Sequence, residues 1–196
     1  MRLRTLLAAF GLVLPTAALA HTGVGATSGV LHGFGHPFGG LDHVLAMVAA
    51  GVLAFVLGGR ALWLVPAAFV AMMVVGFGLG LGWVEMPFVE LGIALSSVVI
   101  GGAAALGRPM PVALAVALVG AFAVFHGHAH GAEMPESAGG FAYAGGFVAA
   151  TALLHATGLA LAAAAASLVG RYGHATARLA GSAFAVGGLG VLAGWF

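Results

Sequence analysis

Apolar residues dominate the chain from residue 37 onward, broken only by short segments that carry Gly, Pro or charged residues. Each apolar run is close to the roughly 20 residues that a helix needs to cross a bilayer. The pattern therefore predicts a bundle of six transmembrane helices joined by short turns, with boundaries good to a few residues. The expected spans are Pro37–Leu57, Ala61–Gly82, Pro87–Leu106, Met110–His128, Phe141–Val169 and Ala175–Trp195.

The first 20 residues have the pattern of a secretory signal peptide. Two arginines precede the short apolar core Leu6–Leu14, and Ala18–Ala20 forms an A-x-A cleavage site. An uncleaved transmembrane helix is the alternative, but the run is too short and Pro15 interrupts it. We expect cleavage after Ala20, which leaves residues 21–196 as a single six-helix domain.

Composition supports an integral membrane protein. Of 196 residues, 62% are hydrophobic and 6% are charged, whereas about 25% of a soluble domain is charged. Cysteine is absent, which excludes disulfides and thiolate metal sites. The 34 glycines include runs such as Gly76-x-Gly78-x-Gly80-x-Gly82 that favour close contact between membrane helices. The nine histidines outnumber the six arginines, a bias that points to imidazole chemistry.

The charged residues predict the orientation of the bundle. Arg60, Arg108, Arg171 and Arg178 fall in or beside three joins that share one side of the six-span pattern. The positive-inside rule makes that side cytoplasmic. Glutamates occupy the other two joins. We therefore expect an inner-membrane protein of bacteria, with both mature termini outside the cytoplasm.

Two histidines and the only aspartate lie at the mouth of the first span, in the segment His36-Pro37-Phe38-Gly39-Gly40-Leu41-Asp42-His43. An ionisable residue in a membrane segment is a functional-site hypothesis by default. Pro37 suits the first position of a helix, on which His36 and His43, seven residues apart, would share one face. Imidazole and carboxylate together suit a divalent first-row metal.

A second polar cluster is expected at the outer end of the fourth span. His126 and His130 are four residues apart, and Glu133 follows His130 by three, so the three side chains share one helical face. His128 points nearly the opposite way. This face would lie at the depth of His36, and the two clusters together offer ligands for nickel, cobalt, zinc or copper.

The two motifs together resemble the HupE/UreJ family of nickel permeases, which accompany bacterial hydrogenases and ureases. The resemblance rests on His36-x5-Asp42-His43 with Ala46-Met47, and on the segment Phe125-His126-Gly127-x-Ala129-His130-Gly131-x-Glu133. It covers the whole mature chain. It implies Ni²⁺ uptake into the cytoplasm through the metal-binding residues His36, Asp42, His43, His126, His130 and Glu133.

Five further residues are candidates for the ion path. Glu90 lies one turn into the third span and His155 near the middle of the fifth, while His21 and His32 belong to the lead-in segment. Phe69 in the second span is a candidate for a constriction, with core packing as its alternative role. His174, beside Arg171 on the cytoplasmic side, is expected to be a loop residue, with a role as an exit ligand as its alternative.

Three functions compete at this stage. The leading hypothesis is a permease that carries Ni²⁺, with Co²⁺ or Zn²⁺ as other substrates. It would be no enzyme and would have no prosthetic group. The alternatives are an intramembrane zinc hydrolase that uses the same cluster and a protein that senses or stores metal. Nothing in the chain resembles a nucleotide-binding loop. We expect the metal ion and the bilayer as partners and no nucleic acid, and we leave a homo-oligomer open.

Overall fold

The protein is described here by a computed structural model of residues 29–195, and every regular element in that range is a helix. The predicted signal peptide and His21 lie outside the described residues. The elements are α1 (Gly29–Gly35), η1 (His36–Phe38), α2 (Leu41–Leu57), α3 (Ala61–Leu81), α4 (Val89–Leu106), α5 (Val112–Ala132), α6 (Gly140–Val169), η2 (Gly170–Tyr172) and α7 (Gly173–Leu192).

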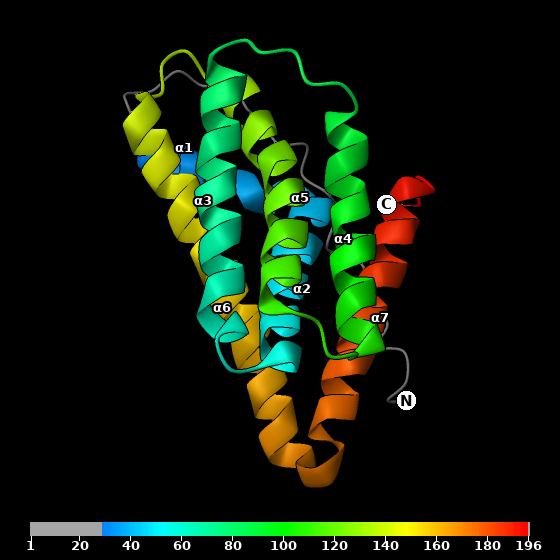
Figure 1. Ribbon diagram of the computed structural model, residues 1–196. Helices are drawn as coiled ribbons and strands as arrows, with labels where there is room; N and C mark the ends of the chain where they lie inside the picture. Colours follow the sequence, from blue (N-terminus) through cyan, green and yellow to red (C-terminus); the bar gives the residue numbers. More distant parts are fainter. Residues whose placement is uncertain (1–28, 196) are drawn as a thin grey trace, which may run out of the picture.

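The expected all-helical architecture is confirmed for the described residues, with five or six candidate membrane spans (Figure 1). The helices α3 to α7 are long and apolar enough to cross a membrane, and a sixth span results if α1, η1 and α2 are counted as one bent segment. The bounds predicted for the second to sixth spans agree with α3 to α7 to within four residues at each end. The largest difference is that α5 continues to Ala132, so that His126 and His130 both lie within the helix.

The expected first span from Pro37 to Leu57 is wrong at its start. Helix α2 begins at Leu41, and the preceding segment Gly29–Phe38 meets it at an angle of 83°. Pro37 belongs to η1 and not to the first turn of α2. Glycine has low helix propensity, and Gly39 and Gly40 together provide the break. His36 and His43 therefore do not share one continuous helical face.

Close contact between α3 and α5 depends on two pairs of glycines. A Cβ on Gly127 would overlap the carbonyl oxygen of Met73, and one on Gly131 would overlap that of Phe77. From the other side, a Cβ on Gly76 or Gly80 would meet carbonyl oxygens of α5. The small-x-x-x-small spacing of both helices thus lets their backbones touch. This contact fixes the position of the histidine-bearing turn of α5.

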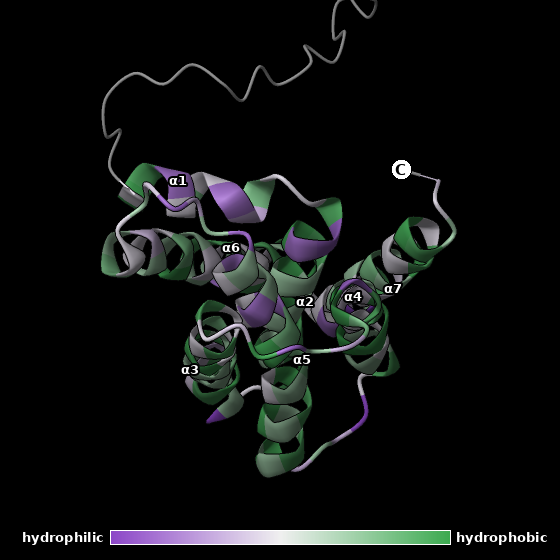
Figure 2. Ribbon diagram, turned by 90° about the horizontal axis from the view of Figure 1, so that it is seen from above, coloured by the Kyte–Doolittle hydropathy of each residue, from purple (hydrophilic) through white to green (hydrophobic). Residues whose placement is uncertain are grey.

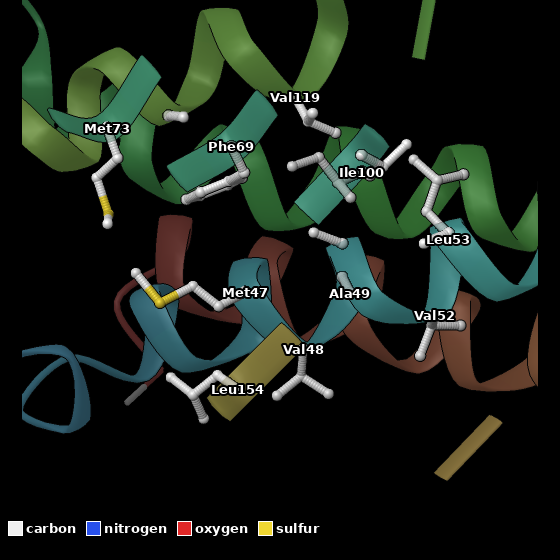
Figure 3. Packing of buried hydrophobic residues seen from close by; sticks show 14 of the residues in the cluster. Met47, Val48, Ala49, Val52, Leu53, Phe69, Met73, Ile100, Val119 and Leu154 are labelled. Carbon is white, nitrogen blue, oxygen red and sulfur yellow. The ribbon is translucent and has the colours of Figure 1, made fainter. Parts of the chain in front are cut away.

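Close backbone contacts at glycines also join α2 to α6 and α4 to α7. Gly51 of α2 meets the carbonyl of His155, and Gly158 of α6 meets that of Val48. Gly101 and Gly181 face each other between α4 and α7. Between these pairs lies a core of buried apolar side chains, in which Met47, Val52, Leu53, Phe69, Met73 and Ile100 are almost completely buried (Figure 3).

The two ends of the bundle differ in charge. The joins that contain Arg60, Arg108 and Arg171 lie at the lower end in Figure 1, whereas those with Glu85 and Glu136 lie at the upper end. Hydrophobic colours cover most of the helices, and hydrophilic colours are confined to short stretches such as those in α1 (Figure 2). Charge is therefore separated along the helix direction, as the sequence pattern predicts.

Candidate functional site

The start of α2 holds Asp42 and His43 against each other. Oδ1 of Asp42 accepts a hydrogen bond from the backbone N–H of His43 at 2.7 Å and one from its Nδ1–H at 3.0 Å. A Cβ on Gly40 would lie 2.6 Å from the same Asp42 oxygen, so a glycine leaves room for this turn. With the proton on Nδ1, Nε2 carries the lone pair, and within residues 29–195 this nitrogen has no hydrogen-bond partner.

His126 is held in a similar way by Ser96 of α4. Ser96 Oγ donates its proton to the carbonyl of Ile93 at 2.5 Å. It therefore accepts the hydrogen bond from Nε2–H of His126 at 2.9 Å. The lone pair of His126 is then on Nδ1, which is buried and without a hydrogen-bond partner in the described chain. A partner that fixes the tautomer and orientation of an imidazole is a regular feature of metal-binding histidines.

Four imidazoles meet at the upper end of the bundle. The ring centroid of His43 lies 4.7 Å from that of His126 and 5.3 Å from that of His130. His36 lies 4.8 Å from His130 and 6.3 Å from His43. The four rings come from η1, α2 and α5, and we call them the histidine group. His130 also stacks on Phe147 of α6, with centroids 4.8 Å apart and ring planes 5° from parallel.

Glu133 closes the outer side of the histidine group. Its Oε2 lies 3.3 Å from Nε2 of His36, and both side chains are partly exposed. The hydrogen bond from His36 is the largest influence on Glu133 and lowers the pKa of its carboxyl, against the opposing effect of partial burial. Glu133 therefore stays ionised at more acidic pH than an ordinary glutamate.

A polar cavity of about 410 Å³ lies above the histidine group. Its lining includes His36 and His43 together with the carboxylates of Asp42, Glu90 and Glu133. Glu90, in the first turn of α4, thus faces the same cavity as the two clusters predicted from sequence. Three carboxylates in one cavity raise the local concentration of cations.

The donors form short-range pairs and not one compact centre. Among the described residues, no three His, Asp or Glu side chains have the mutual spacing of a single metal site. The observed contacts instead place a carboxylate and an imidazole at the mouth, with three more imidazoles behind them. The sequence-predicted residues His36, Asp42, His43, His126, His130 and Glu133 are therefore neighbours in space.

The remaining candidates are distributed along the bundle. His128 points away from the histidine group, as expected from its position on α5, and its Nε2–H donates to the carbonyl of Val84 at 2.7 Å. His32 is exposed on α1. The expectation that His174 is a loop residue is wrong: it lies in the first turn of α7 and stacks on Phe55 at the opposite end of the bundle, with centroids 5.8 Å apart. Phe69 is completely buried, 5.4 Å from His126 and 4.9 Å from His155 between ring centroids.

Sequence reasoning missed two residues of this region. Ser96, which binds His126, could have been noticed as a polar residue inside an apolar span. Tyr143 of α6 is 1% exposed, and its ring centroid lies 6.0 Å from that of His36. A single tyrosine near the outer end of a span was the available signal, but nothing in the sequence relates it to His36.

Comparison with known proteins identifies the family. The sequence model of the family described as HupE / UreJ protein matches residues 8–191 of this chain. The chain belongs to the HupE/UreJ family. It is also 45% identical over 194 residues to Protein HupE of Rhizobium leguminosarum bv. viciae, with 98% of each chain covered. No solved structure matches the chain. The resemblance inferred from the two histidine motifs is therefore confirmed, while the roles of the individual residues stay predictions.

Proposed function

We propose that the protein is a permease that carries Ni²⁺, with Co²⁺ as a second substrate, into the cytoplasm to supply hydrogenase or urease maturation. The observation that carries this proposal is the convergence of His36, His43, His126 and His130 beneath a cavity with three carboxylates. Nitrogen and oxygen donors of this kind suit divalent first-row cations.

The order of the donors supports transport. The carboxylates and His36 are at the mouth and are partly exposed, whereas His126 and His130 are completely buried. A cation first meets charged ligands that attract it and then neutral nitrogens that replace its water. Conduction requires sites that bind well enough to admit an ion and weakly enough to release it. Donors spread over successive depths meet that requirement.

Family membership favours the permease over an enzyme. Neither the family nor the relative named above gives support to the intramembrane zinc hydrolase, and we do not carry that alternative further. A protein that only senses or stores metal would bind Ni²⁺ at the histidine group but would not pass it across a bilayer. Binding and flux therefore have to be measured separately.

The test is uptake of ⁶³Ni²⁺ by liposomes that contain the purified protein. We expect uptake above that of empty liposomes, and competition by Co²⁺. His130→Ala should reduce the initial rate by about tenfold or more, the loss typical when a residue that supports metal binding is removed. His128→Ala is the matched control, because it removes an imidazole from the other face of α5.

Two results would contradict the proposal. Uptake equal to that of empty liposomes, with Ni²⁺ binding retained, would indicate a storage or sensing protein. Equal losses in His128→Ala and His130→Ala would mean that the face of α5 that meets His36 and His43 has no special role.

A further inference from the structure

Two buried sulfur atoms lie one helical turn beyond the histidine group. Oγ1 of Thr151 on α6 is 3.4 Å from Sδ of Met47 on α2 and 3.5 Å from Sδ of Met73 on α3. All three side chains are completely buried. Figure 3 shows Met47 and Met73 extending toward each other from α2 and α3. Three helices thus each bring one donor atom to the same place.

The hydrogen bonding of Thr151 differs from that of the other threonines between residues 29 and 195. The hydroxyls of Thr157 and Thr176 donate to the carbonyl four residues earlier, at 2.8 and 3.0 Å, which is the common choice inside a helix. Thr151 instead points at sulfur, which is a weak acceptor. The hydroxyl of Thr151 has one proton and can donate it to only one sulfur at a time. The sulfur of the other methionine then keeps its lone pairs available.

His155 lies one turn further along α6, on the same face as Thr151. It is 2% exposed, and both of its ring nitrogens lack a hydrogen-bond partner in the described residues. Buried polar atoms are normally hydrogen-bonded, and each exception needs an explanation. The ring of Phe69 contacts both His155 and His126, so that it stands between His155 and the histidine group.

We propose that Met47, Met73, Thr151 and His155 form a second, inner station for the transported cation. This inference rests on the proposed function and extends the path beyond Phe69. Thioether and imidazole donors select soft and borderline cations over Mg²⁺ and Ca²⁺. None of the four donors is a carboxylate, in contrast to the lining of the mouth. A weakly binding set without a carboxylate suits release toward the cytoplasmic side.

The first test uses Ag⁺, a soft cation, as a probe on purified full-length protein. The chain has seven methionines and no cysteine, so every silver–sulfur contact must come from methionine. X-ray absorption at the silver edge should show sulfur neighbours in the wild type. The signal should disappear in the Met47→Leu/Met73→Leu double variant, because leucine keeps the volume and removes the donor.

Met72→Leu is the matched control. Met72 is the neighbour of Met73 in the sequence but is 36% exposed, and no hydrogen bond of the described chain involves its sulfur. It should keep the wild-type silver spectrum. A wild-type spectrum with nitrogen or oxygen neighbours alone would overturn the inner station, and this result does not depend on whether any variant folds. A sulfur signal that persists in the double variant would also overturn the inner station.

The second test is ⁶³Ni²⁺ influx into liposomes. Met47→Leu and Met73→Leu should each lower the rate by roughly tenfold or less, since each removes one weak ligand of several, whereas Met72→Leu should not. Influx of both variants equal to that of Met72→Leu would overturn the inner station and leave transport intact. If the wild type shows no influx but binds Ag⁺ through Met47 and Met73, transport fails and the binding site stands.

Discussion

At the scale of single residues, hydrogen-bond partners decide which ring nitrogen of His43 and of His126 keeps its lone pair. Asp42 binds Nδ1 of His43, and Ser96 binds Nε2 of His126. The nitrogens left over, Nε2 of His43 and Nδ1 of His126, belong to rings 4.7 Å apart. Asp42, expected as a direct ligand, is placed so that it also orients His43.

The role of Ser96 gives a prediction with a close control. Ser96→Ala removes the partner that fixes the His126 tautomer, and we expect Ni²⁺ affinity to fall by about 10-fold to 100-fold. Ser97→Ala should have little effect, since the hydroxyl of Ser97 donates to the carbonyl of Ala94 at 2.9 Å. Equilibrium Ni²⁺ binding to detergent-purified protein measures both. Equal affinities of the two variants would contradict the role assigned to Ser96.

Proton competition gives a second prediction at this scale. Metal binding needs neutral imidazoles and ionised carboxylates, and an unperturbed imidazole titrates near pH 6.5. The hydrogen bond from His36 lowers the pKa of Glu133, so this carboxylate stays ionised through the pH range in which an ordinary imidazole gains its proton. Ni²⁺ binding should therefore weaken through the range in which imidazoles gain protons.

The measurement is equilibrium Ni²⁺ binding between about pH 8 and about pH 5, on either side of the imidazole range. Proton release on binding, followed by a pH indicator, provides an independent readout. A flat binding profile over this range would indicate that carboxylates alone form the outer site.

At the scale of helices, glycine contacts determine where the donors are. Gly127 flanks His126, and Gly131 flanks His130. Both glycines touch the backbone of α3. The same turn of α5 therefore carries the packing surface and the imidazoles. A change in the distance between α3 and α5 would therefore move His126 and His130 relative to His43 on α2.

Gly76 and Gly78 offer a test of this coupling. A Cβ on Gly76 would overlap the carbonyl of Val124 in α5, whereas a Cβ on Gly78 meets nothing within 4 Å. Gly76→Ala should lower the stability by about 1–3 kcal/mol, the usual cost of overpacking. Gly78→Ala should raise it by about 0.5–1 kcal/mol through better helix propensity. Thermal unfolding in detergent should rank the variants in that order, and equal midpoints would mean that α3 and α5 can separate freely.

At the scale of the whole molecule, the bundle separates arginine-rich joins from acidic joins and places the cavity at the acidic end. A cation that enters from the acidic side meets carboxylates before imidazoles. If the arginine side is cytoplasmic, this direction is uptake. The predicted direction of transport therefore depends on the predicted orientation of the bundle, and a test of the orientation tests both.

A reporter fused after Phe196 tests the orientation. With a cleaved signal peptide and six spans, we expect an alkaline phosphatase fusion to be active and a fluorescent protein that folds only in the cytoplasm to be dark. The opposite pattern would require an odd number of spans or an uncleaved first segment.

The sequence by itself determined the helical membrane fold, because a run of about 20 apolar residues in a bilayer has to satisfy its own backbone hydrogen bonds. It also determined which residues are candidates for metal binding, since histidines and carboxylates in apolar spans are costly and stand out. The spacing of His126, His130 and Glu133 on one face followed from helical periodicity alone.

Only the tertiary structure decided how the two clusters meet. The bend at Gly39 and Gly40 brings His36 to Glu133, although a continuous helix was expected from Pro37. The partners Ser96 and Tyr143 come from α4 and α6, far from the histidines along the chain. Sequence periodicity describes one helix at a time. Contacts between helices depend on where small residues let two backbones approach, which is a property of the pair.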